Sequence, residues 1–227
     1  FRLVIAANRD EDHDRPTLAA HFWTDAPNIL GGRDALHGGS WLAMTRAARF
    51  AAVTNLRGSV RDAQKRSRGE LVSNFVRGDA EPQQYIDDVS VRAAEYAGFH
   101  LIAGTLAEAV QLSGVVSKLG DGVRVLTNAP PGIRWPKADT AENAMHKLLG
   151  IDDADALASA VLYFLSEGLN TNRIENEVFV AGERYGTRSS TAIVVTDEEI
   201  IFAEQSYLRG GVRDGAPRQF RFPISAA

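Results

Sequence analysis

The sequence predicts an α+β fold in which helices pack on antiparallel β-sheets. Apolar runs of strand length open the chain, recur in its middle and close it, and helical patterns fill the intervals between them. Strands and helices grouped in this way favour antiparallel sheets, whereas a parallel sheet requires strict alternation of the two. With 227 residues, 44% of them hydrophobic, the chain can bury a sizeable core. We therefore expect one domain over residues 1–227.

The first elements are strands and turns. Residues 1–7 predict a buried strand, and the polar block at 8–16, which ends in a proline, predicts a loop. Because proteins seldom begin inside a core strand, we expect further residues upstream of Phe1. The glycine pairs at 31–32 and 38–39 indicate tight turns or close backbone approach. Residues 40–45 and 50–54 are typical of a β-hairpin.

Four helices follow from apolar spacing and end signals. Ser67 and Glu70 have the spacing of a capping box before an apolar stripe at residues 71–76. Residues 81–97 predict a second helix with Pro82 in its first turn. Asp139 is expected to cap a third helix over 139–149, and a fourth covers 153–165. The remaining expected strands are 99–105, 110–113, 123–127, 191–196, 200–205 and 218–222.

Composition and missing motifs exclude several classes of protein. The net charge of −4 argues against bulk nucleic-acid binding, and no apolar run is long enough to span a bilayer. The chain has no cysteine, so it has neither disulfides nor thiolate metal sites, which fits a cytoplasmic protein. It contains no phosphate-binding glycine loop, no Gly-x-Ser-x-Gly elbow and no His-Glu-x-x-His pair. We expect no metal and no cofactor, and the oligomeric state is not indicated.

Four polar clusters flank the expected strands. They occupy residues 8–11, 54–57, 127–130 and 185–190, and two of them contain Thr-Asn. Strand ends of one sheet can meet at a shared rim, where the scaffold holds polar groups in place. Each cluster taken alone is equally well explained as turn chemistry. Four similar clusters favour a shared site.

The cluster Asn8-Arg9-Asp10-Glu11 resembles the NRDE family, which is also called the transport-and-Golgi-organisation-2 family. The resemblance covers essentially the whole chain in order, through the segments ILGGRD at 29–34, GGSWLA at 38–43, RFAAVTN at 49–55, SRGEL at 67–71, LTN at 126–128, WPK at 135–137 and YGTRSS at 185–190. Together these segments are highly specific, although none is specific alone.

The resemblance implies a fold like that of N-terminal-nucleophile hydrolases, which is a four-layer αββα sandwich of two antiparallel sheets. Family members typically begin Met-Cys, and removal of Met leaves Cys as the first residue. That Cys precedes the strand that opens this chain and is absent from the 227 residues. Without it, we expect these residues to show no covalent catalysis.

In such a site the Cys thiol is the nucleophile and its own α-amine is the general base. Asp10 is the candidate that holds the amine, and Asn55 and Asn128 are candidates for stabilising the oxyanion. These asparagines resemble the two at equivalent strand ends in choloylglycine hydrolases and penicillin V acylases, and Arg188 resembles the late active-site arginine of those enzymes. The alternative readings are a turn cap for Asp10, left-handed turn positions for the asparagines and a structural ion pair for Arg188.

Further residues are candidates for contact with substrate: Arg9, Arg33, Trp41 and Arg57. Arg9 fits ordering of its loop as well, and Trp41 fits a core position as well as a pocket wall. Arg57 opens a basic stretch that continues to Arg68 and includes Arg61 and Lys65, against Asp62. This stretch is either a solvated loop or a site for a carboxylate or phosphate.

Three functions remain open at this point. The first is a cytoplasmic amidohydrolase or acyltransferase that acts on non-peptide C–N amide bonds of a small-molecule substrate. The second, implied by the resemblance, is a binding or trafficking protein for an amphipathic metabolite such as haem or an acyl-CoA. The third is a degenerate homologue without a ligand. An acyl adduct on the upstream Cys favours the first, and ligand binding that survives loss of that Cys favours the second.

Overall fold

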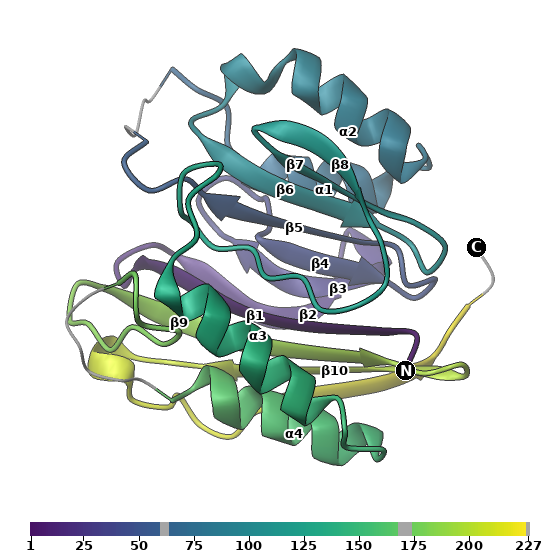
Figure 1. Ribbon diagram of the computed structural model, residues 1–227, viewed down its shortest axis with the longest axis vertical. Helices are drawn as coiled ribbons and strands as arrows, with labels where there is room; N and C mark the ends of the chain where they lie inside the picture. The colour runs from purple at the N-terminus through teal and green to yellow at the C-terminus, as the bar shows by residue number, and fades with distance from the viewer. Residues whose placement is uncertain (60–63, 168–173, 226–227) are drawn as a thin grey trace. The chain divides into compact units, whose positions relative to one another are not determined.

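The computed structural model describes residues 1–59, 64–167 and 174–225, and the chain forms two compact units. One unit comprises residues 1–19 and 135–225, and the other comprises residues 20–134. The strands are β1 Leu3–Asp12, β2 Thr17–Trp23, β3 Ala26–Asp34, β4 Leu42–Thr45, β5 Phe50–Asn55, β6 Phe99–Gly104, β7 Ala109–Ser113, β8 Val115–Leu119, β9 Tyr185–Val195, β10 Glu199–Ser206 and β11 Arg218–Pro223 (Figure 1). The α-helices are α1 Gly69–Arg77, α2 Pro82–Val91, α3 Pro136–Leu148 and α4 Ala154–Leu165.

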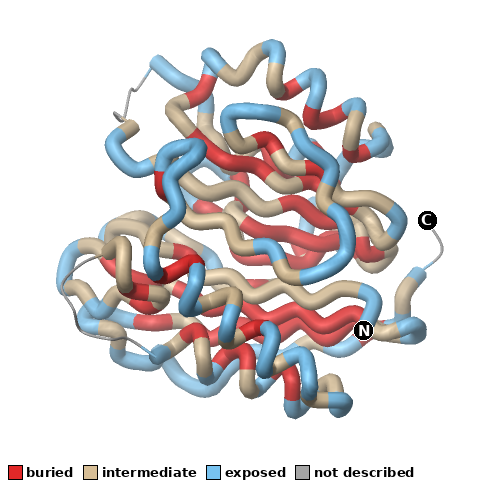
Figure 2. Tube along the Cα trace, in the orientation of Figure 1, coloured by how far each residue is buried: buried red, intermediate tan, exposed pale blue. Residues whose placement is uncertain are grey.

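The unit of residues 1–19 and 135–225 is a four-stranded antiparallel sheet in the order β1-β9-β10-β11. Helix α4 packs on β9, β10 and β1, and α3 packs on α4. The two central strands, β9 and β10, are buried along almost their whole length, and α4 packs on them (Figure 2). Asp153, which the sequence places inside the fourth helix, instead caps α4 by accepting a hydrogen bond from the Ala156 amide at 2.8 Å.

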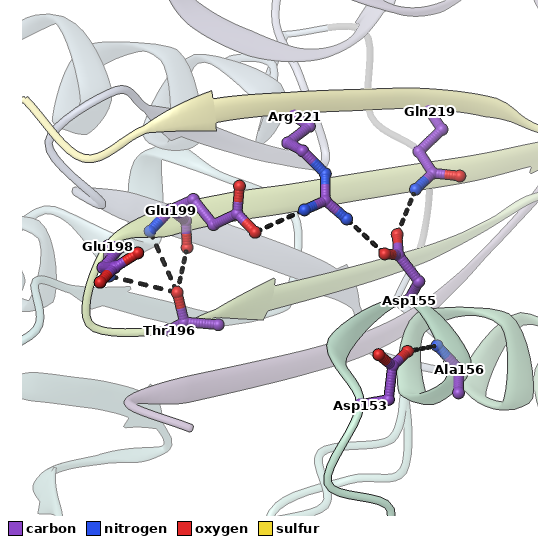
Figure 3. Close-up of polar contacts among 8 residues, drawn as sticks. All are labelled: Asp153, Asp155, Ala156, Thr196, Glu198, Glu199, Gln219 and Arg221. Atoms are coloured by element: carbon purple, nitrogen blue, oxygen red, sulfur yellow. Dashed lines mark hydrogen bonds and ion pairs between the residues drawn. The ribbon is translucent and has the colours of Figure 1, made fainter.

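Charged side chains on the exposed side of this unit tie α4 to the hairpin of β10 and β11. Arg221 on β11 pairs with Asp155 in the first turn of α4 and with Glu199 on β10, where the nitrogen–oxygen distance is 2.6 Å (Figure 3). Asp155 also accepts a hydrogen bond from the Gln219 amide at 2.9 Å. One guanidinium therefore connects the helix to two strands.

The unit of residues 20–134 contains a seven-stranded sheet in the order β2-β3-β4-β5-β6-β7-β8. Helix α1 packs on β3, β4, β5 and β6, and α2 packs on β6, β7 and β8. Both helices share one hydrophobic core with the sheet, in which Phe75 and Tyr85 stack with ring centroids 5.0 Å apart. Gly31 in β3 permits close approach of β4, since a Cβ there would lie 2.6 Å from the Leu42 carbonyl oxygen.

The prediction of an α+β fold with two antiparallel sheets is confirmed. The stacking of those sheets into four αββα layers and the single domain over residues 1–227 stay predictions. The hairpin of β4 and β5 and the strands β6, β7, β10 and β11 lie where the sequence places them, within a residue or two.

The loop expected at residues 8–16 is wrong in its first half, because β1 continues to Asp12. Its pairing with β9 runs on to Asp12 and Tyr185, with a shift in register between Arg9 and Asp10. The strands β2 and β3 were not expected, since β2 does not alternate regularly between apolar and polar residues and β3 contains a glycine pair. The strand expected at 123–127 is absent, and β8 pairs with β7 instead, through a turn at Gly114 with φ of 75°.

Helix ends differ from their sequence signals as well. The capping box of Ser67 and Glu70 is wrong, because Arg68 precedes α1 and Glu70 instead accepts a hydrogen bond from the Tyr96 hydroxyl at 2.6 Å. Helix α2 ends at Val91, well before Ala97, and a short 3-10 helix, η1 Ala93–Glu95, follows it. Helix α3 begins at Pro136, so Asp139 lies inside its first turn. Proline at that position has φ set for a helix and no amide hydrogen to leave unpaired.

Candidate functional site

Asp10 lies beside a break in the pairing of β1 with β9. The register pairs Arg9 with Ser189 but Asp10 with Thr187, so one residue of β9 is left over between them. Such a bulge bends the strand and re-aims its side chains, which makes bulges common next to functional sites. Asp10 therefore lies at an irregular point of an otherwise regular sheet.

The Thr187 hydroxyl connects Asp10 to the segment that precedes β9. It donates to the Asp10 carboxylate at 2.7 Å and accepts from the Val180 amide at 2.9 Å. The Thr187 amide in turn donates to the Val180 carbonyl at 2.9 Å. Thr187 is fully buried, so its hydroxyl is fixed in position and in hydrogen-bonding role.

Burial raises the pKa of the Asp10 carboxyl group above its usual range. The hydrogen bond from Thr187 and the positive charges of Lys137 and Arg9 act in the opposite direction, because each favours the carboxylate. A carboxyl group whose pKa is raised by desolvation while two cations act to lower it is typical of functional sites. Lys137 itself is buried, and it was not among the residues expected at the site. Its one signal in the sequence was the segment WPK at 135–137.

Asn8 and Arg9 hold the strand in place. The Asn8 amide group donates to the carbonyl oxygens of Leu165 and Val178, both at 2.8 Å, and its oxygen accepts from the Ser190 hydroxyl at 2.6 Å. The buried Arg9 donates to the Thr17 hydroxyl at 3.0 Å. These contacts agree with an ordering role for Arg9, and its contact with substrate stays a prediction.

Arg188 binds the turn that follows β1. One guanidinium nitrogen donates to the carbonyl oxygens of Asp12 and His13, both at 3.0 Å, and of Arg15 at 3.3 Å. Three carbonyl acceptors on one nitrogen fix the path of the turn, and this favours a structural role for that end of the side chain. Asp10 and Arg188 are thus brought together in the same unit, on paired strands.

Asn55 and Asn128 are brought together in the unit of residues 20–134. Asn55 ends β5, and two residues later the Arg57 amide donates to the Asn128 carbonyl oxygen at 2.7 Å. The next residue along, Ala129, is held by His100 of β6, whose ring nitrogen lies 2.8 Å from the Ala129 carbonyl oxygen. Both asparagines are half-buried, and their side-chain amides make no hydrogen bond within the described part of the chain. Two side-chain amides that make no hydrogen bond to the described residues therefore lie on neighbouring backbone segments.

The other candidate residues of that unit have structural contacts. Arg33 donates to Asp25 at 2.7 Å and to the Gly38 carbonyl at 2.6 Å, and it stacks on the Trp23 ring. Trp41 is half-buried, and Arg57 is exposed. A role for any of the three in substrate binding stays a prediction.

The basic stretch after Arg57 is mostly engaged with neighbouring backbone and carboxylates. Arg66 pairs with Glu70 and Glu95, Arg68 donates to the Gly98 carbonyl at 3.0 Å, and Lys65 donates to the Ala94 carbonyl. Arg61 and Asp62 lie outside the described residues. These contacts favour the reading of the stretch as a solvated loop that joins α1.

The chain matches a protein-family model described as Transport and Golgi organisation 2 over residues 1–209. It is 30% identical to the human Transport and Golgi organization protein 2 homolog, over all of this chain and 94% of the human protein. The bovine homolog is 31% identical over 92% of this chain and 87% of its own length. The Drosophila melanogaster Transport and Golgi organization protein 2 is 31% identical over 58% of this chain and 47% of its own length.

The helices of the described residues are too short to cross a membrane. The longest, α3, has 13 residues, whereas a transmembrane helix needs about 20 apolar residues.

Proposed function

The chain belongs to the transport and Golgi organisation 2 family, and from that premise we propose that it acts as an N-terminal-nucleophile amidohydrolase or acyltransferase on non-peptide C–N amide bonds. The observation that carries the proposal is the half-buried Asp10 carboxyl group, held by Thr187 beside the cations Lys137 and Arg9. A carboxylate with a purely structural role would destabilise the fold less at the surface, since burial of a charge costs free energy. Its position opposite a bulge of β9 is typical of a functional group.

The proposed nucleophile is the Cys expected upstream of Phe1. Its α-amine takes the thiol proton while sulfur attacks the amide carbonyl carbon, and the same proton then passes to the departing amine. The product is a thioester, which water or a second acceptor cleaves to restore the thiol. Asp10 positions the amine by accepting its N–H groups, and Lys137 and Arg9 favour the ionised form that this requires.

The oxyanion of the tetrahedral intermediate needs hydrogen-bond donors that are already in place. Asn55 and Asn128 supply side-chain amides of this kind, anchored by the backbone contact between Arg57 and Asn128. Each such donor lowers the activation free energy by roughly 2–4 kcal/mol.

The test is the detection of an acyl-enzyme. A chain that carries the N-terminal Cys is incubated with an activated ester such as p-nitrophenyl acetate, and its intact mass is measured. The proposal predicts one added acetyl group, which is absent from the chain with Cys replaced by Ala and from the 227-residue chain. Equal acetylation of all three proteins would overturn it.

A second function is supported by a groove between α3 and α4. It has a volume of about 630 Å³, and its lining includes Ala144, Leu148, Ala160 and Phe164 together with the charged residues Lys147 and Glu167. That volume is within the range of about 300–1,000 Å³ for ligand sites. The groove fits the alternative of a carrier for an amphipathic metabolite, with the apolar part on the walls and an anionic group at Lys147.

Binding of haem and of palmitoyl-CoA tests this alternative. The variant Ala160→Trp fills the groove, whereas Ala156→Trp places the same ring at an exposed position of α4 outside it. The carrier function predicts saturable binding that Ala160→Trp weakens and Ala156→Trp leaves unchanged. Binding that neither or both substitutions affect would count against the groove.

A further inference from the structure

His100 on β6 is a buried histidine to which the proposed acyl transfer assigns no part. Its side chain belongs to a residue that is only 2% exposed, and strand pairing sets it opposite Thr54, the residue before Asn55. The Nε2 atom of its ring lies 2.8 Å from the carbonyl oxygen of Ala129, the residue after Asn128. One histidine therefore connects the two segments that carry the candidate oxyanion donors.

The contact with Ala129 fixes the tautomer of the His100 ring. A carbonyl oxygen can only accept a hydrogen bond, so Nε2 carries the hydrogen and donates it. In the neutral ring Nδ1 is then an acceptor, and it is buried without a partner in the described part of the chain. A buried polar atom without a partner destabilises a fold, and an apolar side chain would avoid that loss. What a histidine provides here, and an apolar residue does not, is the hydrogen bond to Ala129.

Two further hydrogen bonds hold the backbone around Asn128. The Arg57 amide, just after β5, donates to the Asn128 carbonyl oxygen at 2.7 Å. The Ala129 amide donates to the Thr127 hydroxyl at 3.3 Å, which closes a short turn centred on Asn128. The bond from His100 adds the anchor to β6. The placement of Asn128 beside the end of β5 thus depends on contacts of its backbone and not of its side chain.

We propose that His100 is a positioning residue of the acyl-transfer site. Its Nε2–H group holds the segment of Asn128 on β6, beside the end of β5, and this sets the relative placement of the Asn55 and Asn128 side-chain amides. The inference rests on the proposed acyl transfer, and it gives His100 no contact with the substrate. Such an indirect role can have a large effect, since displacement of a catalytic group by about 1 Å can lower a rate roughly a hundredfold.

Hydrogen exchange measured by NMR on the 227-residue protein tests the structural part of the proposal. His100→Gln places an amide N–H where Nε2 stands, whereas His100→Asn carries the same amide on a side chain one carbon shorter, which does not reach Ala129. Protection of the Arg57 amide should be retained in His100→Gln and lost in His100→Asn. The Leu56 amide donates to the Gly98 carbonyl at 3.0 Å and should keep its protection in both variants. Equal protection of the Arg57 amide in the two variants would overturn the proposal.

Acylation by p-nitrophenyl acetate, in the chain that carries the N-terminal Cys, tests the catalytic part. Misplaced oxyanion donors weaken stabilisation of the transition state and not binding of the ester. His100→Asn should therefore lower the acylation rate at saturating ester about tenfold or more, with little change in KM. His100→Gln should restore most of the rate. Leu112→Ala removes a buried apolar side chain of β7 and is the control for lost stability, so its rate should equal that of the unsubstituted chain.

The possible failures have different signatures. Absence of an acyl-enzyme from the unsubstituted chain with its Cys overturns the proposed function and the positioning role together. Acylation of that chain at a rate that is unchanged in a folded His100→Asn variant overturns the positioning role alone, and so does an equal loss of rate in Leu112→Ala. If His100→Asn does not fold, nitrogen NMR of the unsubstituted protein decides. It should find the ring hydrogen of His100 on Nε2, and a hydrogen on Nδ1 alone would overturn the proposal.

Discussion

Thr187 on β9 donates its hydroxyl to the carboxylate of Asp10 on β1, 177 residues earlier in the chain, at a distance of 2.7 Å. The same hydroxyl accepts from the Val180 amide, so it satisfies two half-buried groups at once. The Asp10 carboxyl group consequently has one fixed hydrogen-bond donor, and its protonation state depends on the balance between burial and nearby positive charge.

Replacement of Thr187 by Val is expected to destabilise the protein by about 1–3 kcal/mol, because it leaves the Val180 amide and an Asp10 oxygen without this partner. Urea unfolding at neutral pH measures the change. Thr187→Ser is the control, since it keeps the hydroxyl and should lower the free energy of unfolding much less. Equal loss in both variants would show that packing of the methyl group, and not the hydrogen bond, sets the effect.

Replacement of Asp10 by Asn should make the stability depend less on pH. Burial raises the pKa of Asp10 in the folded state, so ionisation opposes folding, and its unfavourable effect appears as pH rises from the unfolded value through the raised folded value. The free energy of unfolding of Asp10→Asn, relative to the unsubstituted protein, should therefore increase with pH across the acid range and then level off. Urea unfolding at a series of pH values measures this difference. A difference that shrinks as pH rises would contradict the raised pKa.

His13 should titrate below its usual range. Burial lowers its pKa, and the positive charges of Arg188 and Arg209 lower it further. The contribution of His13 to stability is present above the pKa that it has in the unfolded chain. It is lost as pH falls through the lower pKa that it has in the folded protein. NMR titration of the His13 imidazole should give a pKa below the model-peptide value of about 6.5, and Arg209→Ala should raise it. A His13 pKa that is the same in both proteins would remove Arg209 from the explanation.

Arg221→Ala should lower the unfolding midpoint slightly, and the loss should diminish at high salt. Its ion pairs with Asp155 and Glu199 are partly exposed, so screening weakens them (Figure 3). Thermal unfolding at low and high ionic strength measures this. Arg2→Ala removes a more exposed pair, with Asp197, and should change the midpoint less. A loss for Arg221→Ala that is independent of salt would point to packing of its aliphatic stem instead.

The sequence predicts those elements whose signals are local. The hairpin of β4 and β5 depends on residues that are close in the sequence, and it is confirmed. The extension of β1 into a polar block could not be predicted, because Asn8 is satisfied by carbonyls 157 and 170 residues away. The predicted capping box is wrong for a related reason, since the Glu70 carboxylate accepts from the Tyr96 hydroxyl and pairs with Arg66.

The sequence predicts which residues form the candidate site, but it does not predict which other residues they contact. Asp10, Asn55, Asn128 and Arg188 were singled out from the ends of apolar runs and from a family resemblance, and the structure pairs them two by two within the units. Lys137 was missed, because its influence on Asp10 depends on tertiary placement of α3 and not on any spacing in the sequence. Their roles in a reaction stay proposals.

The proposed role of Asp10 in acyl transfer can be tested by the acylation rate of a chain with its N-terminal Cys. The rate is measured for the protein with Asp10 and for the Asp10→Asn variant. We expect a fall of about a hundredfold or more in Asp10→Asn, because a neutral amide holds the catalytic amine poorly. The folded state should be retained, since an Asn oxygen still accepts from Thr187. An acylation rate that is unchanged in a folded Asp10→Asn protein would contradict the role assigned to this carboxylate.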